Sequence, residues 1–101
     1  MKLELESGRI IPDVTEKDIR EQVEREEFAI LSIDSQTYVQ CAEQSKEPYQ
    51  YVLEYQDGSI DEHFVAIDEP ITLERVLSTF VKYLHRDESW RTDFIWEKMS
   101  W

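Results

Sequence analysis

The sequence predicts one α+β domain, in which a mainly antiparallel sheet of about five to seven strands carries two helices on one face. Three observations favour this fold. Apolar residues recur with the alternation of strands and, twice, with the spacing of helices, in the order β-β-α-β-β-β-β-α-β. Most neighbouring strands are joined by turns and not by crossover helices. The 101 residues suit a single core and contain no linker-like tract.

The N-terminal segment predicts a short hairpin followed by a surface helix. Leu3 and Leu5 alternate with charged residues, and a strand at residues 9–11 can pair back onto them. Thr15 is a suitable N-cap for a helix that ends near Glu26. Acid-before-base pairs one turn apart support this helix on a solvated surface.

Two buried strands and a polar connection follow this helix. Residues 28–33 and 37–42 are rich in apolar residues, and a turn at residues 34–36 joins them. Residues 43–47 are polar, and Pro48 follows them. We therefore expect an irregular connection there.

The central hairpin is the clearest local signal. Strands at residues 51–55 and 60–67 flank Asp57-Gly58, a favoured turn pair because glycine tolerates φ > 0. The predicted register pairs Tyr55 with Ile60, Leu53 with Glu62, Tyr51 with Phe64, Glu54 with Asp61, and Val52 with His63. Like charges opposite one another destabilise a hairpin, so Glu54 and Asp61 need solvent or a nearby cation. That cation could come from His63, an arginine of this chain or a partner's lysine.

The C-terminal segment predicts a second helix and a closing strand. Thr72 can cap a helix whose apolar residues recur at helical spacing from residue 73 to residue 84, and we expect it to pack across the sheet. The tail, residues 89–101, fits either a helix or a strand. We favour a strand at residues 94–99 because this run is rich in aromatic residues.

The charge of the chain favours some partners and disfavours others. With 23 acidic and 11 basic side chains, the formal net charge is −12. Such a surface repels nucleic-acid phosphate and anionic lipid, so we expect neither nucleic acid nor a membrane as a partner. A basic protein would be attracted. Residues 43–69 hold eight acids and one base, a net −7, which points to the central hairpin.

We predict a partner-binding site on this hairpin. Its residues are Glu54, Asp57, Asp61, Glu62 and His63, with Trp101 as an exposed aromatic anchor at the end of the chain. Trp96, by contrast, is expected to pack in the core, as Trp90 also can.

The sequence gives little support to catalysis, a metal or a cofactor. The single cysteine, Cys41, lies in an apolar strand pattern, where a thiol is inert. We therefore expect a protein that is not an enzyme and that binds no cofactor. An alternative is a metal-dependent hydrolase that uses Glu54, Asp61 and His63.

The location of the protein is predicted from three absences. The N-terminus lacks the apolar region of a signal peptide. No run approaches the roughly 20 apolar residues of a membrane span. A lone cysteine cannot form an internal disulfide, which fits a reducing compartment. We expect a cytoplasmic protein.

From Tyr51 onward, about half of the chain resembles a family of small bacterial proteins of polymorphic toxin systems, the Imm1-like immunity proteins. The resemblance is carried by the aromatic hairpin with its Asp57-Gly58 turn, the amphipathic helix at residues 72–84, and a closing strand with the pair Trp96-Glu97. Immunity proteins of this kind bind and block a cognate toxin, and many such toxins are basic nucleases. The resemblance therefore implies an inhibitor of a basic toxin domain. A small scaffold domain, including a homodimer, is the other hypothesis.

Overall fold

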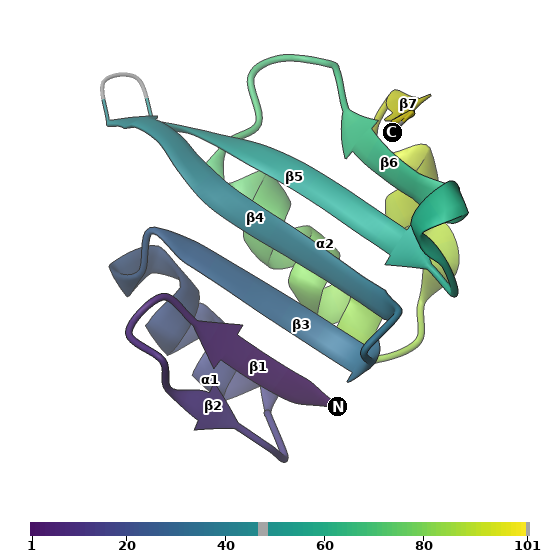
Figure 1. Cartoon of the computed structure of the whole chain (residues 1–101). Coiled ribbons are helices and arrows are strands. Elements are labelled where there is room, and N and C mark those ends of the chain that lie inside the picture. Colours follow the sequence, from purple (N-terminus) through teal and green to yellow (C-terminus); the bar gives the residue numbers. More distant parts are fainter. Residues whose placement is uncertain (47–48, 101) are drawn as a thin grey trace.

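The computed structural model describes residues 1–46 and 49–100, and it confirms the predicted α+β class. Within those residues one antiparallel sheet has the strand order β2-β1-β3-β4-β5-β6-β7, and helices α1 and α2 both lie behind it (Figure 1). The elements are β1 (Lys2–Leu5), β2 (Ile10–Ile11), α1 (Glu16–Gln22), β3 (Phe28–Asp34), β4 (Thr37–Lys46), β5 (Tyr49–Asp57), β6 (His63–Ala66), α2 (Leu73–Leu84) and β7 (Trp96–Lys98). None of the described helices is long and apolar enough to cross a membrane.

Both helices begin where the sequence predicts. The Thr15 side chain accepts a hydrogen bond from the Asp18 backbone N–H (3.2 Å), and the Asp18 carboxylate accepts from the Thr15 N–H (2.9 Å). This capping box starts α1, which continues as a 3₁₀ turn at Val23–Arg25. Thr72 caps α2 in the same way, by accepting from the Arg75 N–H at 3.3 Å.

The core lies between the helices and one face of the sheet. A row of directly paired residues crosses the sheet on that face, and its members are Leu3, Leu31, Val39, Tyr55 and Phe64. The first three are fully buried, as are Val76 and Phe80 of α2, which cover the sheet from behind. Aromatic rings extend this core toward β7: Trp90 and Trp96 each meet Tyr55 edge to face, at 4.9 and 4.7 Å between ring centroids. The predicted packing of both tryptophans in the core is confirmed.

The prediction of an irregular connection at residues 43–47 is wrong for residues 43–46, which the structure describes. Strand β4 continues to Lys46, and its backbone pairs with β5 up to Tyr49, with one irregularity between Glu43 and Ser45. Residue 47 and Pro48 lie outside the described residues. A polar sequence can still form a strand here because backbone hydrogen bonds hold the ladder whatever the side chains are.

The predicted register of the central hairpin is also wrong. Residues Ile60–Glu62 form a 3₁₀ turn, and β6 begins at His63. The observed pairs are Glu54 with Val65, Tyr55 with Phe64, and Gln56 with His63.

Burial explains this register. The predicted register would have placed Glu62 beside Leu53 on the face that forms the core, where an unpaired carboxylate is costly. The observed register keeps Asp61 and Glu62 in an exposed turn and stacks Phe64 on Tyr55, with 4.9 Å between the ring centroids. Glu54 and Asp61 are therefore not opposite each other.

The tail contains a strand, as predicted, but a shorter one. Residues Glu88–Thr92 form a 3₁₀ helix, and β7 covers only Trp96–Lys98, paired with β6. Phe94 precedes the strand and packs against Trp96, with 5.3 Å between the ring centroids.

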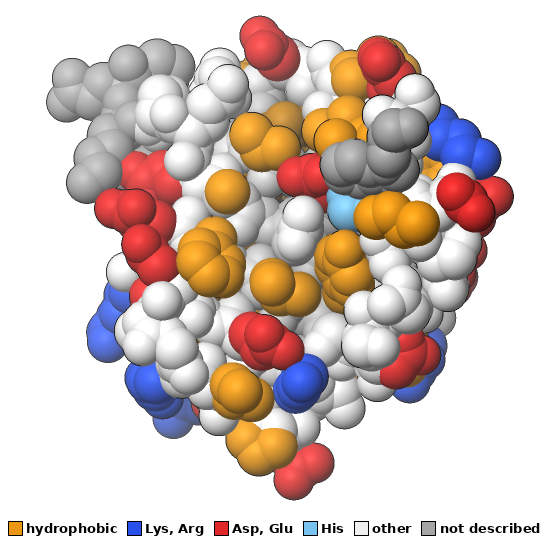
Figure 2. Space-filling view, in the orientation of Figure 1, with side chains coloured by type: hydrophobic (Ala, Val, Ile, Leu, Met, Phe, Trp, Pro, Cys, Tyr) orange, Lys and Arg blue, Asp and Glu red, His pale blue; other side chains and the backbone are white. Residues whose placement is uncertain are grey.

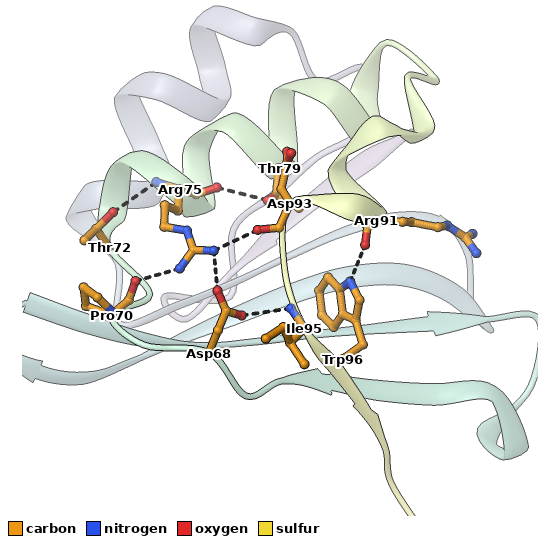
Figure 3. Close-up of polar contacts among 9 residues, drawn as sticks. All are labelled: Asp68, Pro70, Thr72, Arg75, Thr79, Arg91, Asp93, Ile95 and Trp96. Carbon is orange, nitrogen blue, oxygen red and sulfur yellow. Dashed lines mark hydrogen bonds and ion pairs between the residues drawn. The ribbon is translucent and has the colours of Figure 1, made fainter.

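Arg75 of α2 fastens this tail to the rest of the domain (Figure 3). Its guanidinium donates to the Asp68 carboxylate and to the backbone carbonyl oxygens of Pro70 (2.8 Å) and Asp93 (2.9 Å), while its carbon lies 4.3 Å from the centre of the Phe94 ring. Burial acts to raise the pKa of Asp68, but hydrogen bonds from Arg75 and from the Ile95 N–H (3.1 Å) lower it below its ordinary value. These contacts position β7 at the edge of the sheet.

Candidate functional site

The second face of the sheet is left uncovered by both helices (Figure 1). One row of directly paired residues crosses all seven strands on this face: Ile10, Glu4, Ile30, Gln40, Glu54, Val65 and Glu97. Directly paired residues point to the same face, so this row combines three apolar side chains, three carboxylates and the amide of Gln40. Figure 2 shows hydrophobic side chains gathered over the central strands of this face, with acidic side chains among them.

A hydrogen-bonded polar group lies on this open face where β4 and β6 begin and β5 ends. The two ring nitrogens of His63 contact Glu54 (Nε2 to Oε1, 2.8 Å) and Gln56 (Nδ1 to Oε1, 3.0 Å). Tyr38 donates its hydroxyl to the same Gln56 oxygen at 3.2 Å, and the Gln56 amide nitrogen donates to Gln36. We call Gln36, Tyr38, Glu54, Gln56 and His63 the histidine network.

The directions of these hydrogen bonds determine where the protons lie. The Gln56 nitrogen donates to the backbone carbonyl oxygen of Gln36 at 3.2 Å, so the amide oxygen of Gln56 faces His63. That oxygen and the carboxylate of Glu54 are both acceptors, and a His63 ring that satisfies both carries a proton on each nitrogen. The full set of hydrogen bonds therefore holds two protons, one between each His63 nitrogen and the oxygen that it contacts.

The histidine network is mostly buried, although it lies on the open face of the sheet. His63 and Gln56 are each only 3% exposed, whereas the side chain of Glu54 is 20% exposed and can still be reached from outside. Tyr38 packs against the imidazole edge to face, with 6.0 Å between the ring centroids. Burial, helped by the nearby Glu54 charge, raises the pKa of Tyr38, so its hydroxyl stays a donor.

Two hollows flank the network on this face. One, of about 250 Å³, is lined by Phe28, Ile30, Gln40, Ala42 and Glu54. The other, of about 300 Å³, shares Ile30 and Gln40 and extends toward Lys2 and Tyr38. One lies below and the other at the lower end of the roughly 300–1,000 Å³ of sites for small molecules, so they suit single side chains better than a metabolite.

The acids of the predicted site do not form one acidic cluster. Glu54 contacts His63, Asp57 lies 3.5 Å from the Arg91 guanidinium, and Glu62 lies 3.4 Å from the Lys98 ammonium. Asp61 is exposed in the 3₁₀ turn, away from Glu54 in the ladder. Trp101 lies outside the described residues.

The residues of the hydrolase alternative are not gathered into a metal site in the described part of the chain. Asp61 lies in the turn, and no group of three or more His, Cys, Asp or Glu side chains there could hold a metal ion. Cys41 is buried on the helix-covered face, and burial raises the pKa of its thiol to about 12 despite a hydrogen bond with the Ala29 backbone. Such a thiol is a poor nucleophile at neutral pH.

Sequence reasoning identified two members of the network and missed three. The sequence pattern predicts Glu54 and His63 as site residues, places Gln56 in the turn, and gives no signal for Gln36 or Tyr38. A register four residues further along would have placed His63 opposite Gln56 and beside Tyr38. The preference for keeping Glu62 out of the core was the available signal.

Comparisons with known proteins add no relative. No family model matches the chain, and searches of curated proteins and of solved structures find no match.

Proposed function

We propose that this chain is a non-enzymatic, acidic protein-binding domain of the immunity type, which blocks a basic site on a cognate toxin domain. The uncovered sheet face would be its binding surface. The observation that carries the proposal is the composition of that face: apolar side chains such as Phe28, Ile30 and Val52 surround the carboxylates of Glu4 and Glu54.

Such a face suits a protein partner better than a small substrate. Its hollows are shallow, and its apolar side chains lie over several strands, as in an interface where contact area is wide. Half-buried and exposed apolar residues can supply the contact area, and aromatic residues can supply anchors. The net charge of −12 would speed the approach of a basic surface over a longer range.

Ion pairs between the hairpin acids and the C-terminal segment change where this charge acts. Because Asp57 and Glu62 are paired with Arg91 and Lys98, they contribute little uncompensated local charge. The proposal therefore rests on the open face for contact and on the whole chain for electrostatic steering. The acidic tip of the hairpin, from Asp57 to Glu62, would lie beside this surface.

Capture from the native host tests the proposal. The chain, immobilised through its N-terminus, should retain a basic protein at low salt and retain less of it at about 0.5 M salt, where charges are screened beyond a few ångströms. Val52→Lys, on the open face, should abolish capture. Glu74→Lys on the exposed outer side of α2 makes a larger positive change of charge away from that face and should not abolish capture.

The scaffold hypothesis predicts a different result. A homodimer built on the open face would show twice the monomer mass in light scattering, and Val52→Lys would convert it to a monomer. That outcome, with no captured partner, would replace the inhibitor proposal.

A further inference from the structure

The hollow beside Glu54 combines two chemical features. Its walls are the apolar side chains of Phe28, Ile30 and Ala42, and its polar end holds the Glu54 carboxylate and the Gln40 amide. Phe28 is 37% exposed, so its ring is accessible from outside. The hollow therefore offers an apolar wall that ends at an anion.

An arginine side chain matches this arrangement. Its methylene groups can lie against Ile30 and Ala42, and its planar guanidinium can stack on an aromatic ring such as Phe28. A guanidinium also has five N–H donors in a fixed fork, enough to reach both a carboxylate and an amide oxygen. A lysine ammonium would use the carboxylate but would gain less from the ring and the amide.

Glu54 already has one partner, the ring of His63, which is a cation when both of its nitrogens carry a proton. Its Oε1 atom accepts from Nε2 of His63, and the orientation of Gln56 requires the second ring nitrogen to carry a proton as well. A guanidinium at Glu54 would thus lie close to an imidazolium. Two cations that share one carboxylate oppose each other, so either one weakens the binding of the other.

We propose that this hollow receives one arginine side chain of the partner, and that the arginine and the second proton on His63 compete for Glu54. The inference rests on the proposed function for the existence of a basic partner, but the site itself belongs to this chain alone. Among the described residues, the titratable side chains in contact with the His63 ring include Glu54 on β5 and Tyr38 on β4, while Glu62 before β6 and Lys98 on β7 pair with each other. Binding should therefore strengthen as the pH rises and the imidazolium is lost.

The test is a titration of the whole chain with N-acetyl-arginine amide, followed by NMR. N-acetyl-citrulline amide is the matched control because it has nearly the same shape without the charge. The arginine probe should shift the backbone signals of Ile30, Ala42 and Glu54. It should also lower the fraction of His63 rings that are doubly protonated. The citrulline probe should do neither.

The pH dependence gives a second readout. If one proton leaves for each bound cation, the affinity for the arginine probe should rise about tenfold per pH unit while His63 is protonated. In His63→Gln, whose amide can still donate to Glu54, binding should persist without this dependence. In Glu54→Gln, binding should be lost. The wild-type titration stands on its own should either variant fail to fold.

Three results would overturn the inference: no shifts at Glu54 up to about 50 mM probe, which excludes even millimolar affinity; equal shifts with citrulline; or binding that is independent of the His63 proton. If a partner is captured through the open face in spite of such a result, the proposed function stands and only the arginine site fails.

Discussion

The two faces of the sheet bury different kinds of side chain. The covered face consists of apolar residues such as Leu53 and Val39, which are fully buried under α1 and α2. The open face buries a histidine, a glutamine and part of a glutamate among its strands, with their hydrogen bonds satisfied by one another. Burial of apolar groups stabilises a fold directly, whereas burial of polar groups at best recovers what their desolvation costs. The covered face therefore accounts for stability, and the open face is where a function is to be sought.

The largest expected effect concerns the covered face. Leu53→Ala removes a fully buried side chain from β5 and leaves a cavity beneath α2, so the free energy of unfolding should fall by about 3–4 kcal/mol. Urea denaturation followed by tryptophan fluorescence measures this loss. A loss below about 1 kcal/mol would mean that the core does not lie between the sheet and the helices.

The histidine network comes next. His63→Leu fills a similar volume but leaves the acceptors of Glu54 and Gln56 without their donor, which should cost about 2 kcal/mol. The second histidine of the chain provides the control. His85 is exposed and contacts Glu16 of α1, so His85→Leu should leave the denaturation midpoint almost unchanged. Equal effects of the two changes would show that the network contributes no more than a surface contact.

The contacts by which Asp68 and Arg75 hold the C-terminal tail should weaken in acid. The lowered pKa of Asp68 means that the folded state favours its carboxylate, so this contribution to stability is fully present above the ordinary pKa of 3.8. It is lost as the pH falls through the lower pKa of the folded state. Asp68→Asn should therefore cost about 1.5 kcal/mol at pH 6 and progressively less below pH 4, measured by denaturation at each pH. A cost that stays constant with pH would argue against the ion pair with Arg75.

The smallest effect is expected on the open face itself. Val52 is the sequence neighbour of Leu53 but points to the opposite side of the sheet, where it is half-buried. Val52→Ala should cost less than about 1 kcal/mol in the same urea experiment because little apolar surface is lost from the interior. A cost as large as that of Leu53→Ala would mean that another part of the protein covers this face.

The sequence was sufficient to predict the fold class because the signals were local and redundant. Thr15 and Thr72 cap helices whose buried residues recur at helical spacing, and both caps form as expected. Alternation likewise predicts β1, and a run of apolar residues predicts β3. Each of these signals depends on a few neighbouring residues, and none depends on the partner strand.

The register of the central hairpin was mispredicted because it is a non-local property. Asp57-Gly58 does form a bend, with Gly58 at φ +87°, but the chain continues into a 3₁₀ turn before pairing resumes. The stacking of Phe64 on Tyr55 and the contact of Tyr55 with Trp90 decide where pairing resumes. Trp90 lies 35 residues further along the chain than Tyr55, so a local pattern contains no trace of this contact.

The candidate site was predicted in part for the same reason. Counting charges along the sequence marked residues 43–69 as uncompensated, but Arg91 and Lys98 reach Asp57 and Glu62 from the C-terminal segment. Glu54 and His63 were correctly placed on the same face because the error in the register was an even number of residues. Their direct contact with each other could not be predicted without the true register.

The central claim is that the open face of the sheet binds a basic protein, and one comparison tests it most directly. Wild-type chain, Val52→Lys and Glu74→Lys, all shown to be folded, are used to capture proteins from the native host at low salt. The account predicts that wild type and Glu74→Lys retain the same basic protein, that Val52→Lys retains none of it, and that about 0.5 M salt weakens the capture. Retention by all three chains alike, or by none of them, would contradict the account.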